Sequence, residues 1–382
     1  MSTVRKLRDL AIVAAGQGAP QGEENYCTNG IPFIKAGNLI ELLNGKKERD
    51  IQNVSEEVAK QYRLKLYPAG TVLFAKSGMS CMKGYVYVLQ SDCYVVSHLA
   101  CIIPIETTGA YLKYYFEYHR PNSLIKDEAY PSISLSDIGN LDIRLETPVK
   151  QAAIVNNLDR INALIKCRKA QLHKIDDLVK SQFIEMFGGY SLRDKQPHWR
   201  KIGNVAEVVG GSTPKTEKRE FWGGNNCWIT PAEIDDDSFI VKNTVRRLTD
   251  EGVKSCSLKR LPIGTVLLSS RAPIGKVAIA GVEMYCNQGF KNLICGQSLN
   301  SIYTYYLLKF NSEYLNSLGR GATFKEISKA IVDNIAIPVP EMERQNQFAA
   351  FVEQTDKSKF RIKQSLEKLE KCYKALLQKY FG

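Results

Sequence analysis

The feature that most constrains this chain is an internal repeat: its two halves carry matching residues 194 positions apart. The hexapeptide Pro68–Leu73 (PAGTVL) recurs as Pro262–Leu267 (PIGTVL), and the halves end in matching Phe-Gly pairs at Phe187 and Phe381. A duplicated chain with similar but non-identical halves can present two related surfaces about a pseudo-twofold axis. Such a chain suits a ligand that itself has two halves, and bipartite DNA is one such ligand.

Composition narrows the class of partner. The 382 residues carry a formal net charge of +12, and the pI is near 9.1. This length allows two to three domains, and the basic balance favours a polyanion, either nucleic acid or an anionic membrane surface. A basic protein without such a partner would have the same composition, so charge alone does not decide. No apolar run is long enough to span a bilayer, which argues against a membrane protein.

Each half is predicted to be a mixed α+β segment followed by one long helix. Short β-branched runs between Gly, Pro and Asn predict strands at 71–74, 85–88, 265–268 and 276–279. Aromatic-rich stretches predict short helices at 110–119 and 301–310. The predicted fold is therefore α+β, with two pseudo-twofold-related α+β domains joined by two long helices. The predicted boundaries are 1–148 and 189–343 for the domains, and 149–188 and 344–382 for the helices.

The long helices are the clearest local prediction, because apolar residues recur along them at alternating spacings of four and three. Each helix follows a proline, Pro148 or Pro340, and Gly188 ends the first. We expect them to pair as an antiparallel coiled coil, although each could instead pack only on its own domain. The predicted seam consists of Ile154, Leu158, Ile161, Ile165, Leu172, Ile175, Val179, Phe348, Val352, Ile362, Leu366, Leu369 and Leu376.

Familiar catalytic signatures are missing from the sequence. It has no Walker A loop, no Asn/Asp-Pro-Pro-aromatic motif of adenine methyltransferases, no Gly-x-Gly-x-x-Gly after a strand and no nucleophile elbow. Its ten cysteines form no C-x-x-C pair, and no histidine stands at metal-ligand spacing from a cysteine. We therefore expect a non-catalytic cytoplasmic protein with free thiols, no metal and no cofactor. An enzyme with an unrecognised site stays open as an alternative.

Polar loops, densest in the second half, predict a DNA-binding surface. Arginine pairs bidentately with guanine, and Asn or Gln with adenine, whereas lysine and hydroxyl groups suit phosphate. The same residues could simply turn the chain, and we expect Trp222, Trp228 and Phe290 to be core residues. The second-half candidates are Lys215, Thr216, Arg219, Ser270, Arg271, Lys276, Asn287, Gln288, Lys291, Arg320 and Lys325. The first-half candidates are Gln17, Gln21, Lys35, Lys76, Lys83 and His98.

The order of the loop motifs resembles that of the specificity subunits of Type I restriction-modification systems. The resemblance covers essentially the whole chain. In the first half, Gln-Gly-Ala-Pro at 17–20 replaces Gly-Gly-Ser-Thr-Pro, and Ser97-His-Leu replaces Asn287-Gln-Gly. The motifs that carry the resemblance are Gly-Gly-Ser-Thr-Pro at 210–214, Trp-Ile-Thr-Pro at 228–231, Pro-Ile-Gly-Thr-Val-Leu at 262–267, Ala-Pro-Ile-Gly at 272–275, Asn-Gln-Gly-Phe at 287–290 and Ile-Pro-Val-Pro-Glu at 337–341 before Gln345.

The resemblance implies two target-recognition domains, each reading one half of a split double-stranded DNA site. It also implies helices that separate the halves and dock methyltransferase subunits, and through them a restriction and translocation subunit. The protein itself would transfer no methyl group and cut no bond. Three other interpretations stay open: a DNA-targeting adaptor of another modification system, an RNA-binding protein, and a coiled-coil scaffold with nucleic-acid-binding domains.

Overall fold

The computed structural model describes residues 3–189, 191–235, 239–321 and 325–382. The chain forms two compact units, unit 1 (Met1–Lys169 with Gln364–Gly382) and unit 2 (Ala170–Lys363). Each unit therefore combines one mixed α+β segment with one part of each long helix, and the unit boundaries fall within the helices. Of the polar loop at 320–325, residues 322–324 lie outside the described residues.

Unit 1 contains a larger antiparallel sheet and a smaller mixed sheet. Its strands are β1 (Thr3–Lys6), β2 (Ala11–Ala15), β3 (Ile31–Ile34), β4 (Asn53–Val54), β5 (Val72–Ala75), β6 (Val86–Val88), β7 (Tyr94–Val95), β8 (Leu99–Pro104) and β9 (Asp142–Leu145). The larger sheet has the order β2-β8-β5-β6, the smaller one has the order β4-β3-β7, and β1 pairs with β9. Within the smaller sheet, β3 runs antiparallel to β4 and parallel to β7. The short helices are α1 (Leu7–Leu10), α2 (Asn38–Leu43), α3 (Glu56–Gln61), α4 (Gly109–Tyr118) and α5 (Leu135–Gly139).

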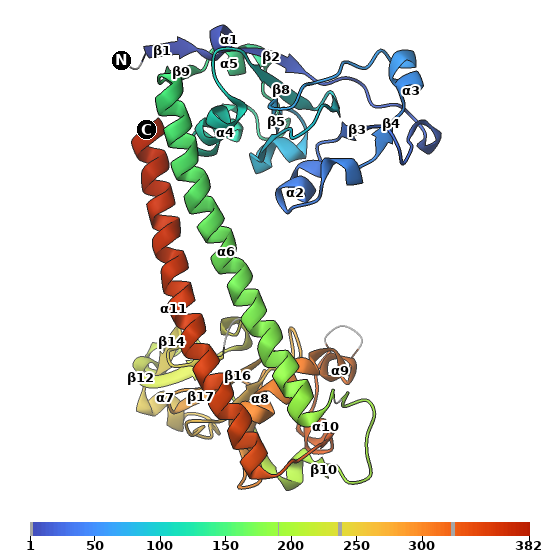
Figure 1. Ribbon diagram of the computed structural model, residues 1–382. Helices are drawn as coiled ribbons and strands as arrows, with labels where there is room; N and C mark the ends of the chain where they lie inside the picture. Colours follow the sequence, from blue (N-terminus) through green and yellow to red (C-terminus); the bar gives the residue numbers. More distant parts are fainter. Residues whose placement is uncertain (1–2, 190, 236–238, 322–324) are drawn as a thin grey trace. The chain divides into compact units, whose positions relative to one another are not determined.

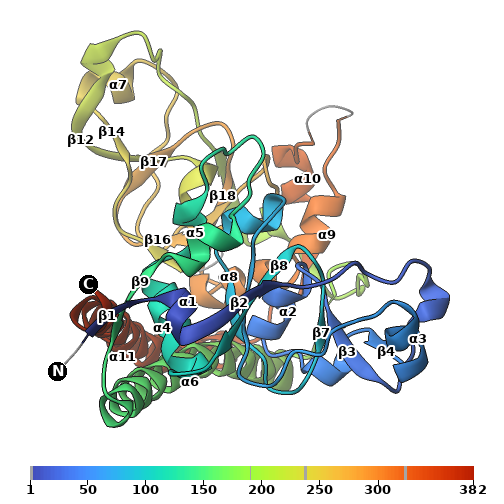
Figure 2. The ribbon, with the colours of Figure 1, turned by 90° about the horizontal axis from the view of Figure 1, so that it is seen from above.

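Unit 2 repeats this topology. Its strands are β10 (Arg200–Lys201), β11 (Ala206–Gly210), β12 (Trp222–Ile229), β13 (Ile240–Val241), β14 (Arg246–Leu248), β15 (Val266–Leu268), β16 (Val277–Ala280), β17 (Met284–Cys286), β18 (Lys291–Cys295) and β19 (Ala336–Ile337). The orders β11-β18-β15-β16, β14-β12-β17 and β10-β19 match the three sheets of unit 1, and β13 adds a parallel edge strand beside β16. The short helices are α7 (Asp250–Lys254), α8 (Ser301–Phe310), α9 (Ser312–Ser317) and α10 (Lys329–Asp333). Figure 2 shows β12, β14 and α7 gathered at one end of this unit, away from α8, α9 and α10.

Local sequence signals explain these elements. The apolar runs that predicted strands near 71–74 and 265–268 form β5 and β15, whose residues are all buried, as expected for central strands. The predicted helix at 301–310 is α8, and the one at 110–119 is α4, one residue earlier. Both helices begin at a side-chain cap. Asn300 accepts from the N–H groups of Ile302 and Tyr303, and Thr108 accepts from that of Tyr111.

The two long helices, α6 (Pro148–Phe187) and α11 (Met342–Phe381), pack together side by side (Figure 1). Their contacts run in antiparallel order within each unit. In unit 1, Asn157 and Asn162 donate to the hydroxyls of Tyr380 (3.4 Å) and Tyr373 (3.2 Å), and Lys169 pairs with Glu370 (3.0 Å). In unit 2, Lys359 pairs with Asp176, and Arg344 donates to the carbonyl oxygen of Met186.

The thirteen residues of the predicted seam are all buried or half-buried, and five of them belong to the apolar cores of the units: Ile154, Leu158, Val179, Phe348 and Val352. Towards the end of each helix, the most buried face moves one residue beyond the expected 3.5-residue repeat. Phe183 and Phe187 are 2% and 3% exposed at the end of α6, and Leu377 and Phe381 are both 7% exposed at the end of α11. A straight α-helix has 3.6 residues per turn, so its buried face drifts from a strict heptad pattern unless the helices supercoil. These end residues pack on the neighbouring domain, as Phe381 does against Tyr111 at a ring-centre distance of 5.2 Å.

A buried glutamine fixes the start of each long helix to its own domain. Gln151, 3% exposed, accepts from Thr107 (2.9 Å) and donates to the carbonyl oxygen of Glu146 (2.7 Å). Gln345, 0% exposed, accepts from the N–H of Asn300 (2.8 Å) and donates to two carbonyl oxygens. The repeat motif around these glutamines therefore sets where each helix leaves its sheet. None of the described helices has both the length and the apolarity that crossing a bilayer would need.

Candidate nucleic-acid interface

In each unit, one short turn joins the larger sheet to the smaller one. We call it the central turn: residues 286–289 in unit 2 and 95–98 in unit 1. In unit 2 it makes backbone hydrogen bonds with three other segments: Ser212 N to Cys286 O (3.0 Å), Asn287 N to Ile229 O (3.1 Å) and Ser270 N to Gly289 O (2.8 Å). In unit 1 the same three bonds are Gln17 N to Val95 O (2.8 Å), Val96 N to Ile34 O (3.0 Å) and Lys76 N to His98 O (2.9 Å).

These hydrogen bonds correct the sequence alignment of the central turns. We expected Ser97 to stand opposite Asn287, but the bonds place it opposite Gln288, and His98 opposite Gly289. The reason is that the chain from Val266 in β15 to the central turn of unit 2 is three residues shorter than the chain from the matching Val72 in β5 to the central turn of unit 1, whereas the expected alignment required four. Sequence similarity is low here, so only the backbone pairing reveals the register.

Both central turns require a glycine opposite them. A Cβ atom at Gly16 would lie 2.2 Å from the carbonyl oxygen of Val96, and one at Gly211 would lie 2.0 Å from that of Cys286. Side chains do not fit at such distances, so only glycine allows this backbone approach. Since each glycine opens a loop that carries candidate residues, it brings that loop against the central turn.

The loops of unit 2 converge around its central turn. Thr213 donates to the side-chain oxygen of Gln288 (2.5 Å), which joins the 211–216 loop to the turn. Isolated β-bridges pair Arg271 and Arg320 with Glu326, which brings the 269–276 and 320–327 loops together. Arg271 is half-buried there. The exposed candidates are Lys215, Thr216, Arg219, Gln288, Arg320 and Lys325.

Two predicted contact residues of unit 2 lie inside the loop cluster, which corrects their expected role. Ser270 is 0% exposed. The Lys291 side chain is 13% exposed, donates to the Ser270 hydroxyl (3.3 Å) and pairs with Glu326 (3.1 Å). Removing a buried group from its partners leaves them unsatisfied, which costs about 1–3 kcal/mol. These side chains therefore support the surface, and their burial argues against the contact with DNA that the sequence predicted.

Three further candidates use their polar atoms to hold the loops. Lys276 donates from Nζ to the carbonyl oxygen of Ile234 (2.5 Å). Asn287 accepts, through Oδ1, from the N–H two residues later in the central turn (2.9 Å). Gln17 donates to the carbonyl oxygen of Arg63 (2.7 Å). All three hold backbone geometry in this structure, and their direct contact with DNA stays a prediction.

In unit 1, three more candidates besides Gln17 lie around the central turn, and Lys83 lies elsewhere. His98 is exposed, with Nδ1 2.8 Å from the Ser77 hydroxyl, and Lys76 is half-buried beside it. Gln21 is exposed on the loop that starts at Gly16. Lys83 instead lines a groove of about 730 Å³ along α11, so the structure separates it from the surface around the central turn.

Sequence analysis missed one exposed cation, Arg246. Its guanidinium carbon lies 3.5 Å from the centre of the Trp222 ring. Trp228 and Phe290 are 2% and 0% exposed, which confirms them as core residues, whereas Trp222 is half-buried beneath Arg246. No motif surrounds Arg246 in the sequence. Only the pairing of β14 with β12 places it against the tryptophans.

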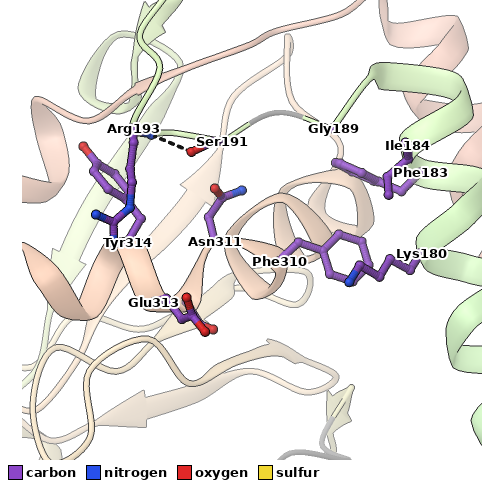
Figure 3. A pocket seen from close by; sticks show the side chains of 11 residues that line it. Lys180, Phe183, Ile184, Gly189, Ser191, Arg193, Phe310, Asn311, Glu313 and Tyr314 are labelled. Atoms are coloured by element: carbon purple, nitrogen blue, oxygen red, sulfur yellow. Dashed lines mark hydrogen bonds between the residues drawn. The ribbon is translucent and has the colours of Figure 1, made fainter.

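The cavity shown in Figure 3 belongs to the framework of unit 2. It measures about 360 Å³, and Phe183 and Phe310 form its apolar wall. Asn311 accepts from the N–H of Leu192 (2.9 Å) and donates to the carbonyl oxygen of Leu307 (2.9 Å). These bonds tie the chain leaving α6 to α8. None of the candidate DNA-contacting residues lines the cavity.

Two buried thiols lie at or next to the central turns. Burial raises the pKa of the Cys286 thiol to about 12, so this thiol is neutral near pH 7. Burial likewise raises the pKa of Cys93, next to the central turn of unit 1, to about 12. Within the described residues, no group of three or more His, Cys, Asp or Glu side chains is placed to hold a metal ion.

Comparison with known proteins identifies the class. The model of the Type I restriction modification DNA specificity domain matches residues 2–175 and 198–371, once in each half. The specificity subunit of the Type I restriction enzyme MjaIX from Methanocaldococcus jannaschii is 40% identical over 185 residues, 48% of this chain and 43% of that protein. The EcoR124I/EcoR124II specificity subunit from Escherichia coli is 26% identical over 216 residues, 54% of this chain and 52% of that protein. The chain thus matches about half the length of these two relatives.

Longer matches extend over nearly the whole chain. The MjaX specificity subunit of M. jannaschii is 22% identical over 405 residues, 98% of this chain and 92% of that protein. Among solved structures, the S subunit of a Type I restriction-modification system from M. genitalium aligns over 100% of this chain and 96% of its own, with 16% identity and a TM-score of 0.60. A second solved structure comes from work on complex assembly and conformational transition of the type I R-M system. It aligns over 100% of this chain and 97% of its own, with 18% identity and a TM-score of 0.59. These two structures share the fold.

The chain therefore belongs to the family of Type I restriction-modification specificity subunits, and it carries the family domain twice. This confirms the family resemblance found in the sequence. It also confirms the α+β fold with two domains joined by long helices that pack together.

Proposed function

We propose that this chain is the DNA-reading subunit of a Type I restriction-modification complex, in which unit 1 and unit 2 each read one half of a bipartite double-stranded site. The central turn carries the proposal. Its three backbone hydrogen bonds and its glycine approach recur in both units, whereas the exposed side chains around it differ. A shared scaffold that presents different polar groups is what two readers of different half-sites require.

The exposed and half-buried candidates divide by chemistry into base readers and phosphate contacts. In unit 2, Arg271 and Gln288 offer the donor and acceptor patterns that match guanine and adenine edges. Lys215, Arg320 and Lys325 are cations on the loops around them and suit phosphate. In unit 1 the corresponding groups are His98, Lys76, Gln21 and Lys35. The net charge of +12 supports this assignment because neutralising phosphates dominates affinity for DNA.

The long helices are proposed to dock the methyltransferase subunits, and a restriction and translocation subunit would join through them. Five large apolar side chains support this role because they stand exposed on α6 and α11: Val149 (83%), Leu164 (49%), Leu178 (50%), Ile184 (45%) and Phe360 (61%). A partner that covered these side chains would remove their apolar surface from water, which is favourable. One of the solved structures with this fold concerns complex assembly of the type I R-M system. The complex would act on DNA in the cytoplasm.

Sequencing of methylated bases in cells with and without this gene tests the proposal. We expect a two-part methylated motif that disappears when the gene is deleted and returns when it is restored. Exchanging residues 189–343 for the same segment of a relative should alter one half of the motif and keep the other. If deletion leaves the methylation pattern unchanged, the chain does not target a methyltransferase.

A further inference from the structure

Unit 2 carries a cation laid over an aromatic ring on its smaller sheet. Arg246 covers Trp222 at 3.5 Å, and its guanidinium carbon lies 5.6 Å from the centre of the Trp228 ring. The two indoles meet edge to face with ring centres 5.0 Å apart. Their N–H groups hold the neighbouring loop, since Trp222 donates to the carbonyl oxygen of Lys215 (3.3 Å) and Trp228 to that of Ser212 (3.1 Å). Arg246 therefore stands beside the loop that contacts the central turn.

Unit 1 has the same arrangement built from different residues. Nζ of Lys35 lies 4.4 Å from the centre of the Tyr26 ring, and Tyr26 meets Phe33 edge to face at 6.3 Å. The Tyr26 hydroxyl donates to the carbonyl oxygen of Pro20 (3.1 Å), in the loop that follows Gly16. Each unit thus has a cation, a ring beneath it, and a polar atom of that ring holding the same loop.

The aromatic positions correspond in the fold, whereas the two cations stand on different elements: Arg246 lies on β14, and Lys35 directly follows β3. Phe33 lies on β3 and Trp228 on β12, the middle strands of the two smaller sheets. Both pair in parallel with the strand that leads into the central turn, Phe33 opposite Tyr94 and Trp228 opposite Tyr285. The arrangement therefore occurs twice beside the central turn, with Trp, Trp and Arg in unit 2 and Tyr, Phe and Lys in unit 1.

The two cations differ in how they are held. Arg246 is exposed, and within the described residues its guanidinium forms no ion pair with a carboxylate. A guanidinium stacked on a ring keeps its N–H edge available to a hydrogen-bond acceptor. Because stacking already restricts the side chain, it loses less conformational entropy when it binds a base. Lys35 is half-buried and also donates to the side-chain oxygen of Gln52 (2.8 Å).

We infer that Arg246 and Lys35 are specificity-determining residues, each donating hydrogen bonds to a base edge of its own half-site in the major groove. The acceptors that suit both side chains are O6 and N7 of guanine. Trp222 and Tyr26 are positioning residues that aim the cations. This inference rests on the proposed function and adds to it the residue of each unit that distinguishes one base.

The test uses a library of duplex DNA with a randomised central segment, bound by the full chain together with its methyltransferase subunits. Sequencing the bound duplexes gives the base preference at each position. Arg246→Ala is expected to lower the preference for guanine at one or two positions of one half by about 5- to 150-fold, and to leave the other half unchanged. Lys35→Ala should do the same in the opposite half.

Matched variants separate reading from folding. Arg260→Ala removes another exposed arginine of unit 2, one paired with Glu283, and should leave every preference unchanged. Trp222→Leu should weaken the same guanine positions as Arg246→Ala, and Trp222→Phe should restore them because a ring is again present. Melting temperatures of all the variants report whether the fold is intact.

Each outcome decides one question. A wild-type complex that selects no two-part sequence contradicts the proposed function itself. A two-part preference that survives unchanged in Arg246→Ala and Lys35→Ala overturns this inference alone. A uniform loss of affinity in Arg246→Ala, with the preferred bases unchanged, also overturns it because the side chain would then contact phosphate.

Discussion

Replacing Phe183 with alanine is expected to destabilise unit 2 strongly, whereas replacing Phe360 with alanine is expected to change its stability little. Both residues lie on the long helices, but Phe183 is 2% exposed and Phe360 is 61% exposed. The Phe183 ring contacts four aromatic rings at centre distances of 5.1 to 5.8 Å: Phe187, Tyr303, Phe310 and Phe348. These rings come from α6, α8 and α11, so Phe183 joins both long helices to the domain.

The magnitude follows from burial. Truncating a fully buried phenylalanine costs about 3–5 kcal/mol, since apolar contacts are lost and a cavity remains. For a unit of this size each kcal/mol lowers the melting temperature by about 2–4 °C, so Phe183→Ala should lower it by roughly 6–20 °C. Phe360→Ala removes a ring that is mostly in water, and a surface change of this kind stays within about 0.5 kcal/mol.

Scanning calorimetry of the full chain measures both shifts, and hydrogen exchange locates them. Faster exchange should appear in α8 and in the parts of α6 and α11 that belong to unit 2. Both variants replace phenylalanine with alanine on the same helix pair, so the difference between their melting temperatures reports the effect of burial. Equal and small shifts for Phe183→Ala and Phe360→Ala would refute the argument that the aromatic cluster holds the helices to the domain.

Three further predictions concern DNA binding and ionisation. If the protein contacts about six to ten phosphates, the slope of log K for DNA binding against log salt concentration should be roughly −5 to −9. Fluorescence anisotropy on the selected duplex with methyltransferase present measures this slope, and a value near zero would contradict the prediction. Arg271→Ala should lose about 1–3 kcal/mol of binding free energy for the selected duplex and little for random DNA. Lys325→Ala should weaken binding to both DNAs equally in the same titration. If Arg271→Ala weakens binding to both DNAs equally, Arg271 does not read a base. Burial raises the pKa of Cys101 from its ordinary value of 9.0 to about 12. The neutral thiol therefore contributes fully to folding stability below about pH 9, and this contribution is lost as the pH rises towards 12. The melting temperature should fall across that window, and iodoacetamide near pH 7 should label the exposed Cys167 and Cys372 before Cys101, as read by mass spectrometry; early labelling of Cys101 would contradict its burial.

The sequence alone determined the features that depend on local signals. The internal repeat indicated two similar domains, because the matching residues keep a constant spacing of 194 positions even though the loop residues differ. The 3.5-residue period predicted both long helices because it requires only the positions of apolar side chains. The helix at 301–310 was predictable to the residue, since Asn300 supplies a cap and an apolar stretch follows it. Local signals of this kind need no knowledge of what packs against them.

Tertiary structure decided which polar residues reach the surface. In the sequence, Ser270, Lys291 and Lys325 are equivalent polar loop residues, yet the first two are enclosed where the loops converge and the third is exposed. Arg246 was overlooked because its role comes from strand pairing with residues about 20 positions earlier in the chain. The physical reason is that composition and period report the average environment of a segment. The exposure of a single side chain depends on which distant segment is packed against it.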